Sequence, residues 1–255
     1  MFPIFNLLYA NKYNAILFFL LCSLLFVKEK IVLLPFDLLM TDTLKDKEAR
    51  AGLVRELEQR GISDAAVLDA FSRVPRHYFV PDFLRDRAYQ PQALPIACGQ
   101  TISQPFTVAY QSQLLSVSPK QKVLEIGTGS GFQAALLQAM GAYVYTVERH
   151  QGLHLAAESL FRQLRIRVAA RHGDGYAGWP EFAPFDRILV TCGVPQLPKQ
   201  LLRQLKTGGV MVVPVGEREQ VMTRVVRTGD DSFETTGHGV YSFVPMLENK
   251  AYSGR

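Results

Sequence analysis

The chain has 255 residues, of which 48% are hydrophobic and 20% charged, and its formal net charge is +5. This length allows one substantial α/β domain with additions, and no internal repeat is visible. The positive charge is spread without a block of consecutive basic residues, which argues against nucleic acid as a partner. The cysteines form no Cys-x-x-Cys pair and no even framework, as is typical of a reducing compartment; they are Cys22, Cys98 and Cys192.

Residues 1–39 form an apolar leader. Residues 15–27 are almost all apolar, and the charged residues 28–30 separate them from a second apolar run that begins at Ile31. Neither run reaches the roughly 20 residues that a membrane-spanning helix needs. We expect the leader to lie outside the fold and the natural chain to start at Met40. A membrane-associated segment and a cleaved signal are the alternatives.

Residues 40–118 begin with two predicted helices. From Thr41 to about Arg60 apolar residues recur among charged ones at helical spacing, and Gly61 can end the helix. A second helix is predicted from Ser63, its expected N-cap, to about Phe71. The two helices predict an N-terminal helical cap.

A glycine-rich loop opens the predicted core, residues 119–215. The apolar strand that ends at Ile126 runs into Gly127, Gly129 and Gly131, which alternate with Thr128 and Ser130. Glycine can take a positive φ and lets a ligand approach the backbone N–H groups. A dinucleotide-binding loop needs Gly-x-Gly-x-x-Gly, but here Phe132 stands where its third glycine belongs. A ligand-binding loop is favoured over an ordinary strand-to-helix turn.

The strands that follow predict a parallel sheet. Residues 143–148 read as a second strand, with Glu148 at the carboxyl end, where a carboxylate can accept both hydrogen bonds of a ribose diol. A third strand ends near Asp174, a fourth covers residues 185–191, and a fifth, residues 210–215, follows a turn at 206–209. Strands that alternate with helices predict a doubly wound, mostly parallel Rossmann-like α/β sheet with helices on both faces.

Residues 216–255 predict a β extension. The segment after Gly216 is strand-like and is broken by residues 228–231, a good hairpin turn, so antiparallel strands are expected. The closing residues from Glu248 are expected to be frayed.

Several motifs resemble known methyltransferases. Glu125-x-Gly-x-Gly-x-Gly after a strand resembles motif I of the S-adenosylmethionine-dependent enzymes, and the segment Gly99-Gln-Thr-Ile-Ser-Gln-Pro105 closely resembles the acceptor-side signature of the protein-L-isoaspartate O-methyltransferases. Residues 74–80, 171–175 and 213–216 agree with that family in the right order. The likeness runs from about Met40 to about Lys250. One departure is Phe106, where some relatives carry histidine.

The resemblance implies a fold, a reaction and a cofactor. The helical cap would help to cover S-adenosyl-L-methionine, whose methyl group would pass to the free α-carboxyl of L-isoaspartyl residues in damaged peptides and proteins and so initiate repair. The product would be S-adenosyl-L-homocysteine, and no metal is implied. The residues expected to bind the cofactor are Glu125, Gly127, Thr128, Gly129, Gly131, Glu148, Arg149, Gly173, Asp174, Gly175 and Thr191.

The acceptor segment carries the predicted catalytic residue, Ser103. Its hydroxyl can donate to a carboxylate without competing as a base, and the family resemblance implies that Thr101, Ile102, Gln104 and Pro105 bind the acceptor beside it. Because an α-carboxyl is already ionised at neutral pH, no general base is needed. A nucleophilic serine is less favoured because no Gly-x-Ser-x-Gly elbow surrounds Ser103. A helix-capping serine before Pro105 is the structural alternative, and both roles could hold together.

Other functions have less support. His150 and His154 are four residues apart on a predicted helix, but no further ligand is spaced to complete a metal site, and both are expected to face solvent. A methyltransferase with a small-molecule or nucleic-acid acceptor is the alternative function, although the Asn-Pro-Pro-Tyr signature of amino-methylating enzymes is absent. A nonenzymatic scaffold is a third reading. We expect a cytoplasmic monomer, with any membrane association confined to residues 1–39.

Overall fold

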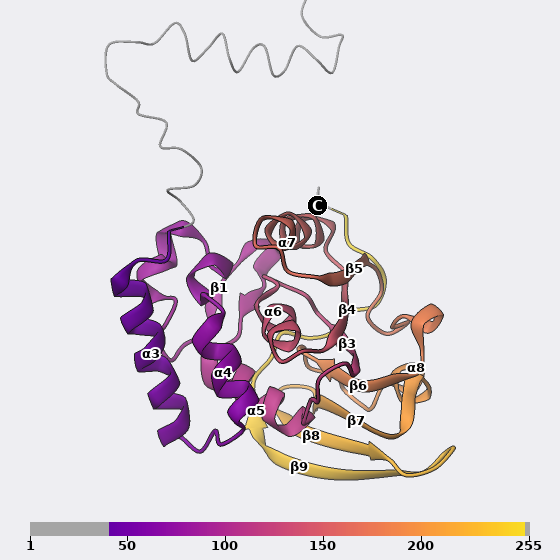
Figure 1. Ribbon diagram of the computed structural model, residues 1–255. Helices are drawn as coiled ribbons and strands as arrows, with labels where there is room; N and C mark the ends of the chain where they lie inside the picture. Colours follow the sequence, from indigo (N-terminus) through magenta and orange to yellow (C-terminus); the bar gives the residue numbers. More distant parts are fainter. Residues whose placement is uncertain (1–40, 253–255) are drawn as a thin grey trace, which may run out of the picture. The chain divides into compact units, whose positions relative to one another are not determined.

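The computed structural model describes residues 41–252, so the predicted leader, residues 1–39, lies outside the described residues (Figure 1). The contacts of the chain group the residues from Asp42 onward into one unit. The expected boundaries at 118/119 and 215/216 therefore separate segments of one body, and as domain limits they stay predictions. Within residues 41–252 no helix combines the length and the apolar character that crossing a bilayer requires.

A sheet of seven strands runs through the protein in the order β5-β4-β3-β6-β7-β8-β9 (Figure 1). Its first five members are parallel and the last two antiparallel, which confirms the predicted fold class. The strands are β3 (Lys122–Ile126), β4 (Tyr143–Glu148), β5 (Val168–His172), β6 (Phe185–Val190), β7 (Leu205–Val215), β8 (Gln220–Arg227) and β9 (Phe233–Tyr241).

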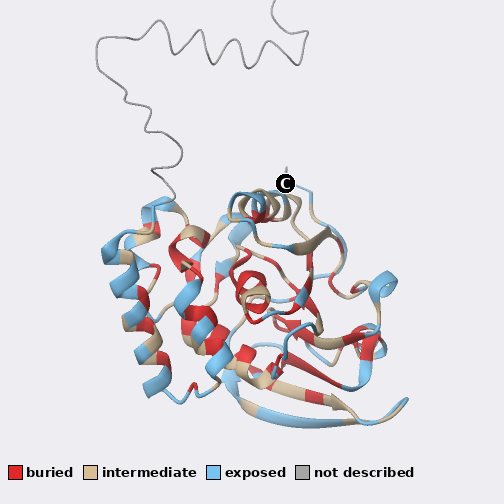
Figure 2. Ribbon diagram, in the orientation of Figure 1, coloured by how far each residue is buried: buried red, intermediate tan, exposed pale blue. Residues whose placement is uncertain are grey.

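Helices cover both faces of this sheet because its central strands are apolar on both sides. In β7, Val210 and Val212 belong to one buried cluster while Met211 and Val213 belong to the other. The first cluster includes side chains from α3 (Leu44–Gln59), α4 (Ala65–Arg73), α5 (Pro105–Leu115), α6 (Phe132–Ala139) and α7 (Gln151–Gln163). The second cluster includes Leu201 of α8 (Lys199–Gln204). Figure 2 shows the buried residues along the central strands and on the inner sides of the helices.

The predicted helical cap is present, with one correction at its second helix. Helix α3 begins with a capping box, in which the Thr43 hydroxyl accepts from the backbone of Asp46 and the Asp46 carboxylate accepts from the backbone of Thr43. Helix α4 begins one residue later than predicted, because the Asp64 carboxylate accepts from two backbone N–H groups of the first turn while the Ser63 N–H donates to Gln113. The expectation of Ser63 as N-cap was wrong.

Short elements connect the cap to the core. They are the 3₁₀ turns η1 (Arg76–Phe79), η2 (Asp82–Arg87) and η3 (Ala97–Gly99), and the two-stranded ladder of β1 (Leu94–Pro95) and β2 (Thr101–Ile102); a further turn, η4 (Pro180–Phe182), precedes β6. The ladder places the acceptor segment directly before α5.

The fifth strand is longer than predicted. Residues 206–209, expected as a turn, lie within β7, and the pairing with β6 shifts register between Phe185 and Arg187. Gly208 takes a positive φ of 76°, and Arg227 donates to the carbonyl of Leu205 over 2.6 Å. A β-bulge, held by Arg227 of the antiparallel strand β8, therefore stands where a turn was expected at residues 206–209.

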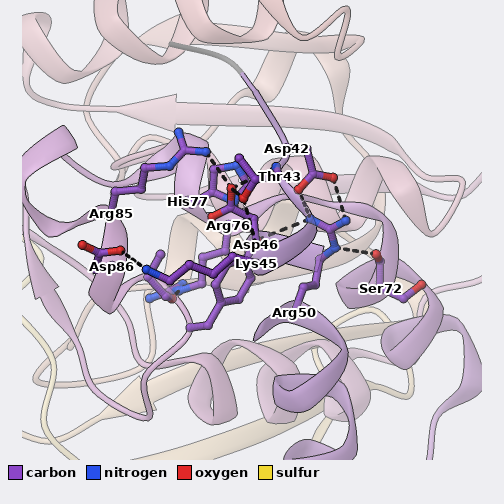
Figure 3. A network of polar contacts seen from close by, with 12 residues as sticks. Asp42, Thr43, Lys45, Asp46, Arg50, Ser72, Arg76, His77, Arg85 and Asp86 are labelled. Atoms are coloured by element: carbon purple, nitrogen blue, oxygen red, sulfur yellow. Dashed lines mark hydrogen bonds and ion pairs between the residues drawn. The ribbon is translucent and has the colours of Figure 1, made fainter. Parts of the chain in front are cut away.

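A network of charged side chains holds the start of α3 against η1 and η2 (Figure 3). Arg50 forms a bidentate pair with Asp42 at 2.8 and 3.0 Å and also donates to the carbonyl of Ser72. Arg85 pairs with Asp46 over 2.9 Å. The ring of His77, 2% exposed, lies 2.7 Å from the Tyr89 hydroxyl through Nδ1, while its buried Nε2 has no partner within the described residues.

The network shifts the pKa values of two of its members. Burial, reinforced by the positive charge of Arg85, lowers the pKa of His77 to about 4. Burial would raise the pKa of Asp46, but hydrogen bonds from Thr43 and Arg85 outweigh it and bring the pKa to about 2. Between about pH 6.5 and pH 4 the unfolded chain therefore binds a proton at His77 more readily than the folded chain, so the folded state loses stability as pH falls through this range. The ionised Asp46 stabilises the folded state, and this contribution is lost only below about pH 4.

His77→Gln should change how stability depends on pH. The free energy of unfolding of the variant minus that of the native chain should be about 1 to 2 kcal/mol larger at pH 5 than at pH 7. The reason is that the folded native chain must keep His77 neutral at pH 5, which costs it stability. Urea unfolding of both proteins at the two pH values measures this difference. An unchanged difference would show that His77 has an ordinary pKa in the folded state.

Candidate active site

The glycine loop after β3 is shaped by close neighbours. Gly127, Gly129 and Gly131 all have positive φ, at 96°, 52° and 87°. A Cβ atom at Gly127 would lie within 2.4 Å of the Thr191 hydroxyl, and one at Gly131 within 2.7 Å of the Phe161 ring. Thr191 in turn donates to the carbonyls of both Ile126 and Gly127. The alternating glycines therefore let the loop lie against β6 and α7.

Glu148 ties this loop to the end of β4. Its carboxylate accepts from the backbone N–H of Gly129 and of His150, each over 2.9 Å, and the residue is 4% exposed. A carboxylate has about four acceptor positions, so two remain for a ligand. Glu148 thus orders the loop and can still accept the two hydroxyls of a ribose.

Glu125 lies behind the loop. It is fully buried and receives a 2.5 Å hydrogen bond from Thr146, whose hydroxyl also lies 2.6 Å from that of Thr128. Burial raises the pKa of Glu125 to about 8, so it is mainly a neutral acid at pH 7. The side chains of Glu125 and Thr128 are buried and support the loop from within, and the expectation that these residues contact the cofactor stays a prediction.

A first hollow opens over the loop at the carboxyl edge of the sheet. Six predicted cofactor residues line it, namely Gly127, Gly129, Glu148, Arg149, Gly175 and Thr191. Gly131 and Gly173 lie outside its lining and are buried. Sequence reasoning missed the other lining residues, which are Gln100, Ile126, Val147, His150, Cys192, Val244, Pro245, Met246 and Leu247; Thr101, predicted for the acceptor, also lines it.

Asp174 is engaged by the end of the chain. Its carboxylate accepts from the backbone N–H of Tyr176 and of Asn249, each over 2.9 Å, and it does not line the first hollow. Arg149 donates to the carbonyls of Glu248 and Asn249 and accepts from the N–H of Ala251. Residues 248–251 are therefore pinned to the site, which corrects the expectation that they are frayed.

A second hollow of about 590 Å³ adjoins the first. Three residues, Thr101, Thr191 and Val244, line both. The predicted acceptor residues Ser103 and Gln104 also line the second hollow, whereas Ile102 and Pro105 are buried and do not. Its remaining lining residues are Arg60, Ala93, Phe106, Thr107, Val240, Tyr241, Ser242 and Phe243, of which only Phe106 had been singled out from the sequence.

The backbone of Ser103 is held by a buried arginine. Arg76, 1% exposed, donates to the carbonyls of Ala88 and Ser103 over 2.8 Å each, and its guanidinium lies 4.9 Å from the centre of the Phe132 ring. The Ser103 carbonyl accepts one of these bonds, and the Ser103 hydroxyl has no hydrogen-bond partner among residues 41–252. Helix α5 is entered through Gln104 without a side-chain cap. Ser103 therefore does not cap α5, and its hydroxyl is available to a ligand.

The histidines do not form the metal pair considered from the sequence. His154 is only 12% exposed in its side chain, because its ring stacks on His172, so the expectation that it faces solvent was wrong. Over residues 41–252, the three side chains close enough to share a cation are Asp42, Asp46 and His77. Arg50 and Arg85 already neutralise both carboxylates there, which leaves little attraction for a cation.

Comparison with protein families identifies one match. A family model described as protein-L-isoaspartate(D-aspartate) O-methyltransferase matches residues 48–251. Among curated proteins, the protein-L-isoaspartate O-methyltransferase of Flavobacterium johnsoniae is 52% identical over 212 residues, which are 83% of this chain and 100% of that protein. The protein of the same name from Salinibacter ruber is 49% identical over 225 residues, 84% of this chain and 98% of that one.

Solved structures agree in fold. A structure described as protein-L-isoaspartate O-methyltransferase has a TM-score of 0.71 and 29% identity, over 78% of this chain and 66% of that one. A Plasmodium falciparum protein, solved in complex with S-adenosyl-L-homocysteine, has a TM-score of 0.69 over 78% of this chain and 99% of that one. At 22% identity the second comparison concerns the fold alone.

Proposed function

The chain belongs to the protein-L-isoaspartate(D-aspartate) O-methyltransferase family, and from this premise we propose how its own residues serve the reaction. The enzyme transfers the methyl group of S-adenosylmethionine to the free α-carboxyl of L-isoaspartyl residues in damaged peptides and proteins. The observation that supports our assignment of residues is the pair of adjoining hollows, one over the glycine loop and one beside Ser103.

The first hollow fits the nucleoside of S-adenosylmethionine. Gly127 and Gly129 present backbone without side chains, and Glu148 has acceptor positions left for the ribose diol. Gly175 and Thr191 line the same space, and Arg149 positions the C-terminal residues that help to enclose it. When bound, S-adenosylmethionine supplies an electrophilic methyl group on a sulfonium.

The second hollow fits the acceptor peptide. No His, Asp or Glu among the described residues lines it, so it offers no carboxylate or imidazole as a general base. None is required, because the α-carboxyl has a pKa of roughly 3.3 to 3.7 and is ionised at neutral pH. What the site must supply is alignment and exclusion of water, and alignment can account for roughly 7 to 11 kcal/mol of a barrier. The residues common to both hollows mark where the two substrates meet.

Ser103 is the proposed acceptor ligand. Ser103 lines the second hollow, its hydroxyl has no hydrogen-bond partner among residues 41–252, and Arg76 fixes its backbone. Donation to one carboxylate oxygen would leave the other oxygen free to attack the methyl group. Thr101, which lines both hollows, and Gln104 can support the same peptide, while Ile102 and Pro105 shape the segment from beneath.

The compartment and the partners of the enzyme are proposed from its composition and from the residues that line the hollows. The absence of cysteine pairs fits a reducing cytoplasm, and the diffuse charge gives no reason to invoke nucleic acid. We propose a monomer, because each chain contributes residues to both hollows by itself. Size-exclusion chromatography with light scattering would test this oligomeric state.

An acceptor assay tests the proposed function. The protein is incubated with methyl-labelled S-adenosylmethionine and one peptide in its isoaspartyl and its normal aspartyl form. Base-labile label should appear on the isoaspartyl peptide alone, since only that form offers a free α-carboxyl within the chain. Labelling of neither form, or of both equally, would contradict the proposed acceptor.

Ser103→Ala should weaken acceptor turnover and spare cofactor binding. Loss of a hydrogen bond to a charged group is worth roughly 1.5 to 3 kcal/mol, so kcat/KM for the isoaspartyl peptide should fall about tenfold to hundredfold. Ser118→Ala, on an exposed loop outside both hollows, is the matched control. Unchanged kcat/KM in Ser103→Ala would remove Ser103 from the mechanism.

Glu148→Ala should weaken cofactor binding by a similar factor. It removes a carboxylate that accepts charge-assisted hydrogen bonds, each worth roughly 1.5 to 3 kcal/mol, so the Kd of S-adenosylhomocysteine measured by calorimetry should rise about tenfold to hundredfold. The control is Glu125→Gln, which keeps the shape of a side chain that is already mainly neutral at pH 7 and should leave this Kd within about twofold. Equal losses in both variants would count against a direct role for Glu148.

A further inference from the structure

The second hollow has one charged side chain among the described residues that line it, Arg60. We propose that Arg60 binds an acidic side chain next to the isoaspartyl residue and so makes the enzyme prefer damaged peptides with Asp or Glu beside the damage. The inference rests on the proposed function and names the substrate class of the same site.

Arg60 is held in the hollow by an aromatic stack. It follows the last residue of α3, and its guanidinium carbon lies 4.1 Å from the centre of the Phe106 ring. Phe106 stacks on Tyr110, with ring centres 5.7 Å apart and planes 10° from parallel, and Tyr110 stacks on Tyr241. An arginine on an aromatic face keeps its N–H groups at the edge of the guanidinium plane, where a carboxylate can bind them.

The protein uses little of the hydrogen-bonding capacity of Arg60. One nitrogen of the guanidinium lies 3.3 Å from the carboxylate of Glu56, one helical turn earlier, and both side chains are about 38–39% exposed. An exposed pair of this spacing is worth only about 0.3 to 0.5 kcal/mol. The other N–H groups have no partner among residues 41–252. A peptide carboxylate can therefore bind Arg60 beside Glu56 or displace it.

The walls of the hollow favour such a pair. Phe106, Tyr241 and Phe243 line it together with Val240 and Val244, so Arg60 is the cation among apolar and aromatic neighbours in the described lining. No acidic side chain among the described lining residues competes inside it. An acidic peptide side chain is the ligand for which this surface is complementary.

The position of Arg60 separates it from the reacting carboxylate. The methyl group must be transferred where the two hollows meet, beside Thr101, Thr191 and Val244. Arg60 lines only the second hollow. Because Ser103 already supplies the proposed contact to the isoaspartyl carboxylate, Arg60, held against Phe106 at the end of α3, is assigned to a flanking residue of the peptide.

Peptide pairs test the assignment. Isoaspartyl peptides with Glu or Gln at each flanking position in turn are compared by kcat/KM in the full-length enzyme. At one position or more, Glu should be preferred about three- to tenfold, and the preference should decline as salt is raised from about 0.05 to about 0.5 M. Methylation of the Gln peptides shows that the proposed function holds, independently of any preference.

Variants of α3 make the test specific. Arg60→Gln should bring the ratio of kcat/KM for the Glu and Gln peptides to about one, and Arg60→Lys should retain part of the preference. Glu56→Gln should enlarge the preference, because it removes the competing carboxylate. Arg55→Gln removes the same charge from an exposed position on the same helix, outside both hollows, and should change nothing.

Two outcomes would overturn the inference. If the native enzyme methylates Glu and Gln peptides equally at every position, Arg60 does not read the flanking sequence. If Arg60→Gln slows all isoaspartyl peptides by the same factor, Arg60 acts on the reacting carboxylate or on the fold. Failure of the native enzyme to methylate any isoaspartyl peptide would instead contradict the proposed function itself.

Discussion

The site depends on one carboxylate, that of Glu148. It accepts from Gly129 in the loop after β3 and from His150 at the start of α7, and so joins two strand ends that the sheet merely places side by side. Because the glycine loop has no side chains at alternate positions, its backbone needs such an external partner to adopt one shape. The same carboxylate lines the first hollow. The group that orders the loop is therefore also the one that we propose for recognition of the nucleoside, and the buried side chains of Glu125, Thr146 and Thr128 form a hydrogen-bonded chain nearby.

The chemistry explains why so few reactive side chains are present at the acceptor. A reaction between a carboxylate and a sulfonium loses charge on the way to its transition state, so strong electrostatic contacts to the ground state would slow it. The residues common to both hollows include two with hydroxyls, Thr101 and Thr191, whereas the cation Arg60 lines only the second hollow. Such a lining can orient the peptide without holding the reacting anion too tightly. The buried Arg76 also avoids a strong contact to the reacting anion, because it donates to the carbonyl of Ser103 and so fixes the backbone there.

Sequence reasoning succeeded where a function is encoded locally. The glycine spacing, the acid at the end of β4 and the acceptor segment each lie in one short run, and the parallel strands bring their ends together by topology. It failed where contacts are distant. Glu125 follows the motif pattern but lies within the sheet, so its burial depends on neighbours in other strands. The contribution of residues 244–247 and the pairing of Arg60 with Phe106 arise from segments far apart in the chain, and no periodicity announces them. Ser63 and Asp64 can both cap a helix, and in the structure the Asp64 carboxylate accepts from the first turn while the N–H groups of both residues donate to Gln113.

Residues 244–247, near the end of the described chain, line the first hollow, which we propose as the nucleoside site. The backbone N–H groups of Met246, Asn249 and Ala251 donate to the Gly193 carbonyl, the Asp174 carboxylate and the Arg149 carbonyl, and residues 244–247 form one wall of the first hollow. On this proposal, a premature stop codon that removed residues 244–251 would take away a wall of the site for the methyl donor together with the contacts that hold it.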